Sequence, residues 1–121
     1  MKFDPMRPIW LQVMICLETD ILTGKLPPGA KLPGGRDLAL EYEINPNTAA
    51  RVYQELEKSG LCETRRGMGT YVTENRETIS ALRAQMASEA ADRFFRDLAA
   101  LGMDHDDAIR FLNERKDTDH A

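Results

Sequence analysis

Hydrophobic side chains recur every three or four positions along several stretches of this 121-residue chain, the spacing that places them on one face of an α-helix. The first stretch predicts a helix over residues 9–23. Its regularly spaced apolar residues are Ile9, Val13, Leu17 and Ile21. Residues 26–35 are dense in proline and glycine, which predicts an extended connector. The apolar side chains of residues 36–43 share one face, so a short helix is predicted there.

The signals for a third helix are strong at both ends. Asn45 is a good N-cap, Pro46 suits the first helical position, and Gly60 stands just past the end. The face predicted to be buried consists of Ala49, Val52, Tyr53 and Leu56. The opposite face is polar, lacks carboxylates, and consists of Asn47, Arg51, Gln54 and Lys58. A helix that is held from behind and presents hydrogen-bond donors outward is suited to reading a DNA groove.

A hairpin and two more helices are predicted in the rest of the chain. Residues 61–65 and 70–73 favour strands, around a basic tip with two glycines, Arg66-Gly67-Met68-Gly69. Apolar residues at steps of three and four then predict one long helix over residues 77–101. The last helix is predicted from Asp104, whose side chain can cap it. The residues expected to face inward from this helix are Ala108, Ile109 and Leu112.

The order helix, helix, turn, helix, hairpin is that of a winged helix-turn-helix domain. The predicted fold class is therefore mainly α with a small β-hairpin wing, followed by a two-helix C-terminal tail. We place the winged helix at residues 8–74 and the tail at residues 75–116.

Charge is distributed unevenly along the chain, although the net charge is only −4. Residues 1–23 carry 2 basic and 3 acidic side chains, residues 24–76 carry 8 and 7, and residues 77–121 carry 6 and 10. The middle of the chain is thus mildly basic, and the acidic total does not exclude a polyanionic partner.

The composition excludes a transmembrane helix, because no run of about 18 uncharged apolar residues exists. The N-terminal stretch does not have the pattern of a signal peptide. Cys16 and Cys62 are far apart and lack CxxC spacing, so we expect small buried thiols in a reducing, cytoplasmic setting rather than a disulfide or a redox pair.

Six short motifs, in order, resemble the GntR family of bacterial regulators. They are Pro8-Ile9-Trp10, Leu26-Pro27-Pro28-Gly29-Ala30-Lys31-Leu32-Pro33, Arg36-Asp37-Leu38-Ala39, Asn45-Pro46-Asn47-Thr48, Tyr53-Gln54-Glu55-Leu56 and Arg65-Arg66-Gly67-Met68-Gly69-Thr70. Only about 45 residues follow the wing, and the start of the third helix also resembles the short YtrA-type subfamily. That resemblance implies a tail that serves dimerisation, where other members of the family carry a large effector-binding domain.

The resemblance implies DNA contacts from the second helix, the third helix and the wing. These contacts are assigned to Arg36, Asn47, Thr48, Arg51, Arg65, Arg66, Gly67 and Gly69. Arg51 can pair with guanine and Asn47 with adenine, whereas Thr48 and Arg36 are better suited to phosphates. The tail residues expected at the dimer seam are Leu82, Met86, Phe94, Phe95 and Leu98. A ligand pocket formed between two tails is the alternative for these side chains.

Together these features predict a homodimeric, sequence-specific DNA-binding repressor that acts on an inverted-repeat operator. The YtrA-type resemblance adds a transporter operon as the regulated target. The alternative function is a winged helix that docks a protein partner without DNA readout. We expect no enzyme and no cofactor, because the chain has no His-based dyad, no metal-ligand set and no nucleophile beside a base. A small-molecule effector is not assigned.

Two positions depart from the pattern of the family. Gly34 replaces the usual Ser and so loses a capping hydroxyl at the start of the second helix. Glu43 replaces the usual Gly in the turn, where it is expected either to adopt a left-handed conformation or to widen the turn. Its carboxylate is expected near the DNA, so affinity rather than the fold should be affected.

Two apparent ligand motifs have simpler structural explanations. The glycine-rich residues 29–36 lack the Lys and Ser/Thr of a phosphate-binding loop, which favours a connector. His105 lies among three aspartates, but neighbouring residues at a helix start point in different directions. A capped, acidic first turn is therefore expected there rather than a metal site.

Overall fold

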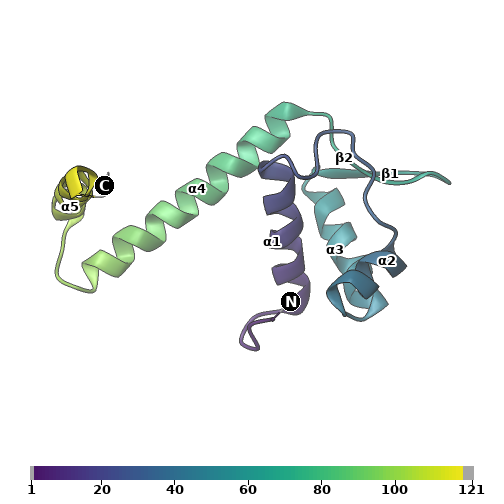
Figure 1. Cartoon of the computed structure of the whole chain (residues 1–121), viewed down its shortest axis with the longest axis horizontal. Helices are drawn as coiled ribbons and strands as arrows, with labels where there is room; N and C mark the ends of the chain where they lie inside the picture. Colours follow the sequence, from purple (N-terminus) through teal and green to yellow (C-terminus); the bar gives the residue numbers. More distant parts are fainter. Residues whose placement is uncertain (1, 119–121) are drawn as a thin grey trace. The chain divides into compact units, whose positions relative to one another are not determined.

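The computed structural model describes residues 2–118, which form five helices and a two-stranded antiparallel hairpin (Figure 1). The helices are α1 (Ile9–Leu22), α2 (Gly35–Tyr42), α3 (Pro46–Lys58), α4 (Arg76–Ala99) and α5 (His105–Thr118), and the strands are β1 (Cys62–Arg65) and β2 (Gly69–Val72). This order confirms the predicted winged helix-turn-helix followed by two helices. The chain divides into two compact units, residues 1–81 and 82–121.

The core of the first unit forms around the apolar face of α3. Helices α1 and α2 and strand β1 all pack against α3. All four residues predicted for the buried face of α3 are buried: Ala49, Val52, Tyr53 and Leu56. Helix α1 contributes Val13, Leu17 and Ile21, whereas Ile9, which was grouped with them, is 44% exposed because it begins the helix. The start of α4 adds Ile79 to the same core.

The proline-rich connector between α1 and α2 does more than link them, because it pairs with the hairpin. The N–H of Leu32 donates to the carbonyl of Thr70 at 2.8 Å, and the N–H of Val72 donates to the carbonyl of Ala30 at 2.8 Å. The sequence predicted an extended connector but not this pairing. The hairpin itself aligns Cys62 with Val72 and Arg65 with Gly69. The wing is thereby attached to the segment that leads into α2.

The turn between α2 and α3 contains a residue in the left-handed helical region. Glu43 has φ 55° and ψ 49°, and the following N–H, of Ile44, donates to the carbonyl of Ala39 at 2.9 Å. The first of the two expected conformations for Glu43 is therefore confirmed, and the turn is not widened. Gly34 stands at the N-cap of α2 without a side-chain hydrogen bond, as its lack of a hydroxyl requires.

The second unit joins the later part of α4 to α5 through a tight turn. Gly102, at φ 81°, ends α4, and the N–H of Asp107 donates to Oδ1 of Asp104 at 2.8 Å. The hydrogen bonding is reciprocal, since the N–H of Asp104 donates to Oδ2 of Asp107 at 3.0 Å. This backbone hydrogen bond, with a further contribution from Arg110, lowers the pKa of the Asp107 carboxyl. The predicted capped, acidic first turn of α5 is thus present.

The inward face predicted for α5 is only partly buried. Ala108 is 1% exposed, but Ile109 is 40% exposed and Leu112 is 42% exposed. The prediction is therefore confirmed for Ala108 and wrong for Ile109 and Leu112, because within this unit a single neighbouring helix cannot cover the whole apolar face. A stacked contact of 4.5 Å between the ring centroids of Phe95 and His105 joins the two helices.

Replacing Glu43 by Gly should stabilise the first unit. An L-residue in the left-handed region costs about 1–2 kcal/mol, and the extra chain entropy of glycine offsets part of this gain. We expect the free energy of unfolding to rise by about 0.5–1 kcal/mol, measured by urea denaturation. The matched control is Glu41→Gly in α2, which should lower the free energy of unfolding by about 1 kcal/mol. Destabilisation by both variants would contradict the left-handed conformation of Glu43.

Candidate nucleic-acid interface

The outer face of α3 is open and is positioned by a cap at its first turn. The side chain of Asn45 accepts a hydrogen bond from the N–H of Asn47 at 2.8 Å, and Pro46 occupies the first helical turn. The side chains on the outward face of α3 are exposed: Asn47, Arg51, Gln54 and Lys58. Thr48 is half-buried at the edge of this face. Glu55, which lies on the flank of this face, brings its carboxylate close to both cations of the face.

Arg51 is held by two neighbours that the sequence did not identify as part of the site. Its guanidinium carbon lies 4.3 Å from the centroid of the Trp10 ring. Its Nε lies 3.9 Å from Oε1 of Glu55, one helical turn further along α3. Lys58 approaches the same oxygen at 3.6 Å. The four-residue spacing of Arg51 and Glu55 was the available signal for this pair, whereas nothing local indicates that Trp10 lies over Arg51.

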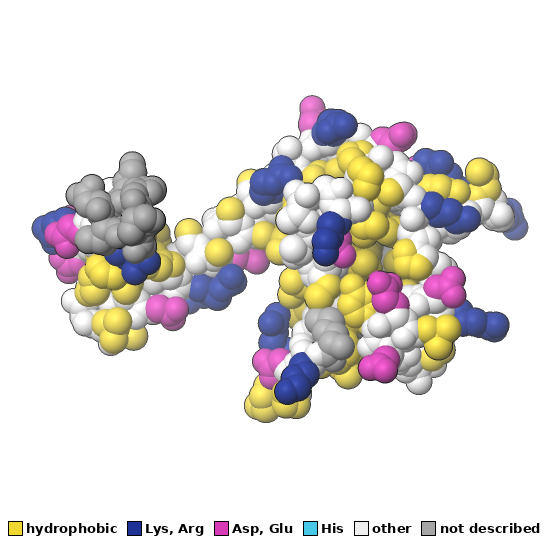
Figure 2. All heavy atoms as spheres, in the orientation of Figure 1, with side chains coloured by type: hydrophobic (Ala, Val, Ile, Leu, Met, Phe, Trp, Pro, Cys, Tyr) yellow, Lys and Arg dark blue, Asp and Glu magenta, His cyan; other side chains and the backbone are white. Residues whose placement is uncertain are grey.

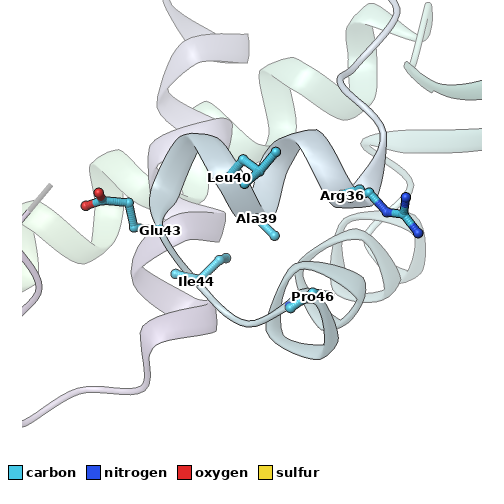
Figure 3. Close-up of a pocket in the computed structure, with 6 residues that line it drawn as sticks. All are labelled: Arg36, Ala39, Leu40, Glu43, Ile44 and Pro46. Carbon is cyan, nitrogen blue, oxygen red and sulfur yellow. The ribbon is translucent and has the colours of Figure 1, made fainter.

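Arg36 lies in the first turn of α2, at one edge of an apolar hollow (Figure 3). The hollow has a volume of about 490 Å³ and is lined by Arg36, Ala39, Leu40, Glu43, Ile44 and Pro46. Figure 3 shows the side chains of Arg36 and Glu43 at opposite ends of it. Leu40 is 73% exposed there. The carboxylate of Glu43 therefore stands at the end of α2, as expected, and away from the guanidinium of Arg36.

The wing presents its cations at the end of the hairpin, where Figure 2 shows basic side chains next to apolar ones. Arg65 contacts Glu63 at 2.9 Å and lies over the ring of Tyr71, with 4.2 Å between the guanidinium carbon and the ring centroid. The hydrogen bond to Glu63 raises the pKa of Arg65. Arg66 is exposed at the tip, where Gly67 has φ 74°.

Gly69 is favoured by its backbone conformation, and the side chain of Lys31 lies close beside it. Its φ is 116°, and a Cβ at this position would lie 3.0 Å from Cε of Lys31. The side chain of Lys31 therefore passes directly beside the hairpin, because Lys31 pairs with Tyr71 in the backbone ladder. Lys31 is a cation beside the wing that sequence reasoning missed, since it was assigned only to the connector.

The predicted site residues thus lie on three elements of one compact unit. Arg36 lies in the first turn of α2. Helix α3 carries Asn47, Thr48 and Arg51 in its first half, and the wing contains residues 65–69. The arrangement offers cations and hydrogen-bond donors on a protruding surface and not in a closed cavity. Such a surface can bind a polyanion that is itself grooved.

The described residues contain no cluster of three or more His, Cys, Asp or Glu side chains arranged to hold a metal ion. No described helix is both long and apolar enough to cross a membrane. Within the described part of the chain, the two cysteines are not joined in a disulfide. Burial raises the pKa of the Cys62 thiol to about 12 and also raises that of Cys16, so both favour the neutral thiol.

Comparison with known proteins identifies relatives of this chain by sequence and by fold. Residues 11–72 match the family model described as bacterial regulatory proteins, gntR family. The HTH-type transcriptional repressor YtrA of Bacillus subtilis (strain 168) is 45% identical over 79 residues, which are 64% of this chain and 61% of YtrA. These matches confirm both the family resemblance and its YtrA-type character.

Two solved structures extend the comparison. A GntR family transcriptional regulator from Listeria monocytogenes superimposes with a TM-score of 0.85 at 34% identity, over 93% of this chain and 98% of that one. AraR(DBD) in complex with operator ORX1 superimposes with a TM-score of 0.56 at 26% identity, over 60% of this chain and 93% of that one. The first likeness covers both units, and the second includes a DNA-bound protein.

Substitutions of Asn45 should separate the stability of α3 from DNA binding. Asn45→Ala removes the cap and should lower the free energy of unfolding by about 1 kcal/mol. Asn45→Asp keeps a capping oxygen and should leave the free energy of unfolding unchanged. It should weaken DNA binding, because a carboxylate then stands at the N-terminal end of α3 and repels phosphates. Urea denaturation and fluorescence anisotropy with labelled DNA measure the two effects. Tight DNA binding by Asn45→Asp would show that this end of α3 does not face DNA.

Proposed function

Because the chain belongs to the GntR family of bacterial regulatory proteins, which are DNA-binding transcriptional regulators and not enzymes, we propose that it is a homodimeric repressor of an inverted-repeat operator. The observation that carries this proposal is the exposed outer face of α3, which presents Asn47, Arg51, Gln54 and Lys58 while the opposite, apolar face is buried. In the proposed complex α3 enters the major groove. The wing then lies against the neighbouring backbone or minor groove.

Each site residue has a role that its chemistry supports. Arg51 can pair with O6 and N7 of guanine, and Asn47 can pair with N6 and N7 of adenine, which is direct reading of base edges. Arg36 and Thr48 are assigned to phosphates, which fix the register of α3 on the duplex. In the wing, Arg65 and Arg66 supply charge, and Gly67 and Gly69 allow the backbone to come close to DNA.

The tail is proposed to join two copies of the chain. The seam is assigned to Leu82, Met86, Phe94, Phe95 and Leu98. The proposal is supported by large apolar side chains of the second unit that remain exposed in the single chain. They are Leu101, Ile109, Phe111 and Leu112. Leu98 is already buried within one chain, with 9% of its surface exposed, so we place it behind the seam. The half-buried Met86 is placed closer to the partner. A two-fold dimer would place two copies of α3 on successive turns of the operator.

The domain roles and the setting follow from this arrangement. Residues 8–74 bind DNA and residues 75–116 hold the dimer. Repression occurs by occlusion of a promoter in the cytoplasm, and the YtrA-type character adds a transporter operon as the proposed target. A protein-docking winged helix is the competing function, and the exposed Leu40 beside the hollow in Figure 3 is the surface that it would use.

Binding to DNA can be tested with a fragment of the protein's own promoter and a scrambled fragment, each at two salt concentrations. We expect preferential binding that weakens steeply with salt, because binding to phosphates releases counterions. Arg51→Ala should reduce the preference for the promoter fragment by about 1–3 kcal/mol. Arg66→Ala removes the same charge but should weaken binding to both fragments equally and lower the salt slope by about 1. Binding without preference, or independent of salt, would favour the protein-docking function.

The dimer can be tested by placing a charge on its proposed seam. Met86→Glu should convert the dimer to monomer and weaken operator binding at least tenfold, since a carboxylate would be buried at the seam without a partner. Analytical ultracentrifugation gives the oligomeric state. Ser88→Glu adds the same charge at an exposed position of α4 and should leave the dimer intact. A stable dimer in Met86→Glu would place the seam elsewhere.

A further inference from the structure

We propose that Trp10 is a positioning residue for DNA recognition, which holds the Arg51 guanidinium in the orientation that reads a base. This inference rests on the proposed function, in which Arg51 contacts guanine. Trp10 lies in the first turn of α1, and α1 packs along α3. The guanidinium carbon of Arg51 is 4.3 Å from the centroid of the Trp10 ring. This contact joins residues 41 positions apart in the sequence and brings an aromatic face to the recognition surface.

Stacking on Trp10 and pairing with guanine use different parts of the guanidinium. The guanidinium carbon lies over the Trp10 ring, whose quadrupole attracts the cation, and an arginine that stacks on an aromatic ring does so through the flat face of its guanidinium. Hydrogen bonds to guanine O6 and N7 leave from the edge of the same group, in its plane. Both contacts can therefore exist at once. Arg51 loses rotamer freedom before DNA arrives, so less entropy is lost when the base contact forms.

Trp10 restrains Arg51 more effectively than the neighbouring carboxylate does. Nε of Arg51 lies 3.9 Å from Oε1 of Glu55, which is beyond hydrogen-bond distance. Glu55 is also shared with Lys58 at 3.6 Å. The Arg51 side chain remains 55% exposed, so the ring does not bury it away from an approaching duplex.

The start of α1 is itself fixed, which keeps the Trp10 ring in place. Gln12 is 9% exposed and binds the segment before the helix through its side chain. Its Oε1 accepts the N–H of Asp4 at 2.8 Å, and its Nε2 donates to the carbonyls of Asp4 at 2.8 Å and Arg7 at 3.1 Å. The helix end that carries Trp10 is therefore anchored to the segment before it.

A double-mutant cycle with Trp10→Leu and Arg51→Ala tests the proposal on the preferred promoter fragment and the scrambled one. Trp10→Leu should weaken binding to the preferred fragment about three- to tenfold and leave the scrambled fragment unaffected, on the scale of an exposed cation–π contact. In the Arg51→Ala background, Trp10→Leu should have no further effect. Trp10→Phe keeps an aromatic face and should restore most of the affinity.

The fluorescence of Trp10 gives a second readout that needs no change at this position, because it is the only tryptophan of the chain. Its emission should shift in Arg51→Ala without DNA, and thermal unfolding should confirm that each variant is folded. Equal losses from Trp10→Leu in both backgrounds, or an emission unchanged by Arg51→Ala, would overturn the positioning role and leave the proposed function standing. An Arg51→Ala variant that keeps the full preference for the promoter fragment would remove Arg51 from base reading and overturn the positioning role. Unmodified protein that binds both fragments equally would overturn the proposed function.

Discussion

The burial of one face of α3 is the interaction on which the rest of the winged helix depends. Val52 and Leu56 are completely buried, and α1, α2 and β1 all pack on the face that contains them. Tyr53 reaches past this core to donate a hydrogen bond to the carbonyl of Pro33, which ties α3 to the connector. With one side of α3 occupied in this way, its polar side is fixed toward the surrounding solution.

Local patterns in the sequence were sufficient for the elements that carry their own boundary signals. The cap by Asn45, the proline after it and Gly60 at φ 81° define α3 by interactions within a few residues. Contacts between distant residues were not accessible in the same way. The pairing of Leu32 with Thr70 and the position of Trp10 over Arg51 depend on how separate elements pack, for which no local pattern exists. The exposure of Ile109 has the same origin, since its apolar character does not reveal what covers it.

Three cations of the interface share a further property, which is that each has an acidic neighbour. Arg51 and Lys58 lie near Glu55, and Arg65 pairs with Glu63. Exposed pairs of this kind contribute little to stability. They do reduce the local excess of positive charge. The attraction to the phosphates of DNA that lacks the preferred base sequence is therefore weaker. A surface of this kind favours discrimination between sequences over strong attachment to any DNA.

The ladder between the connector and β2 has a mechanical consequence. The N–H of Leu32 donates to Thr70, and the chain continues from Leu32 to Arg36 at the start of α2. The wing and the start of α2 are therefore joined by a short, hydrogen-bonded path. The separation between these two parts is therefore set by the protein. In a complex, a duplex with a wider or narrower groove would have to deform to meet both at once. In the proposed complex, the ladder would thus make the stiffness and groove width of the DNA part of what is recognised.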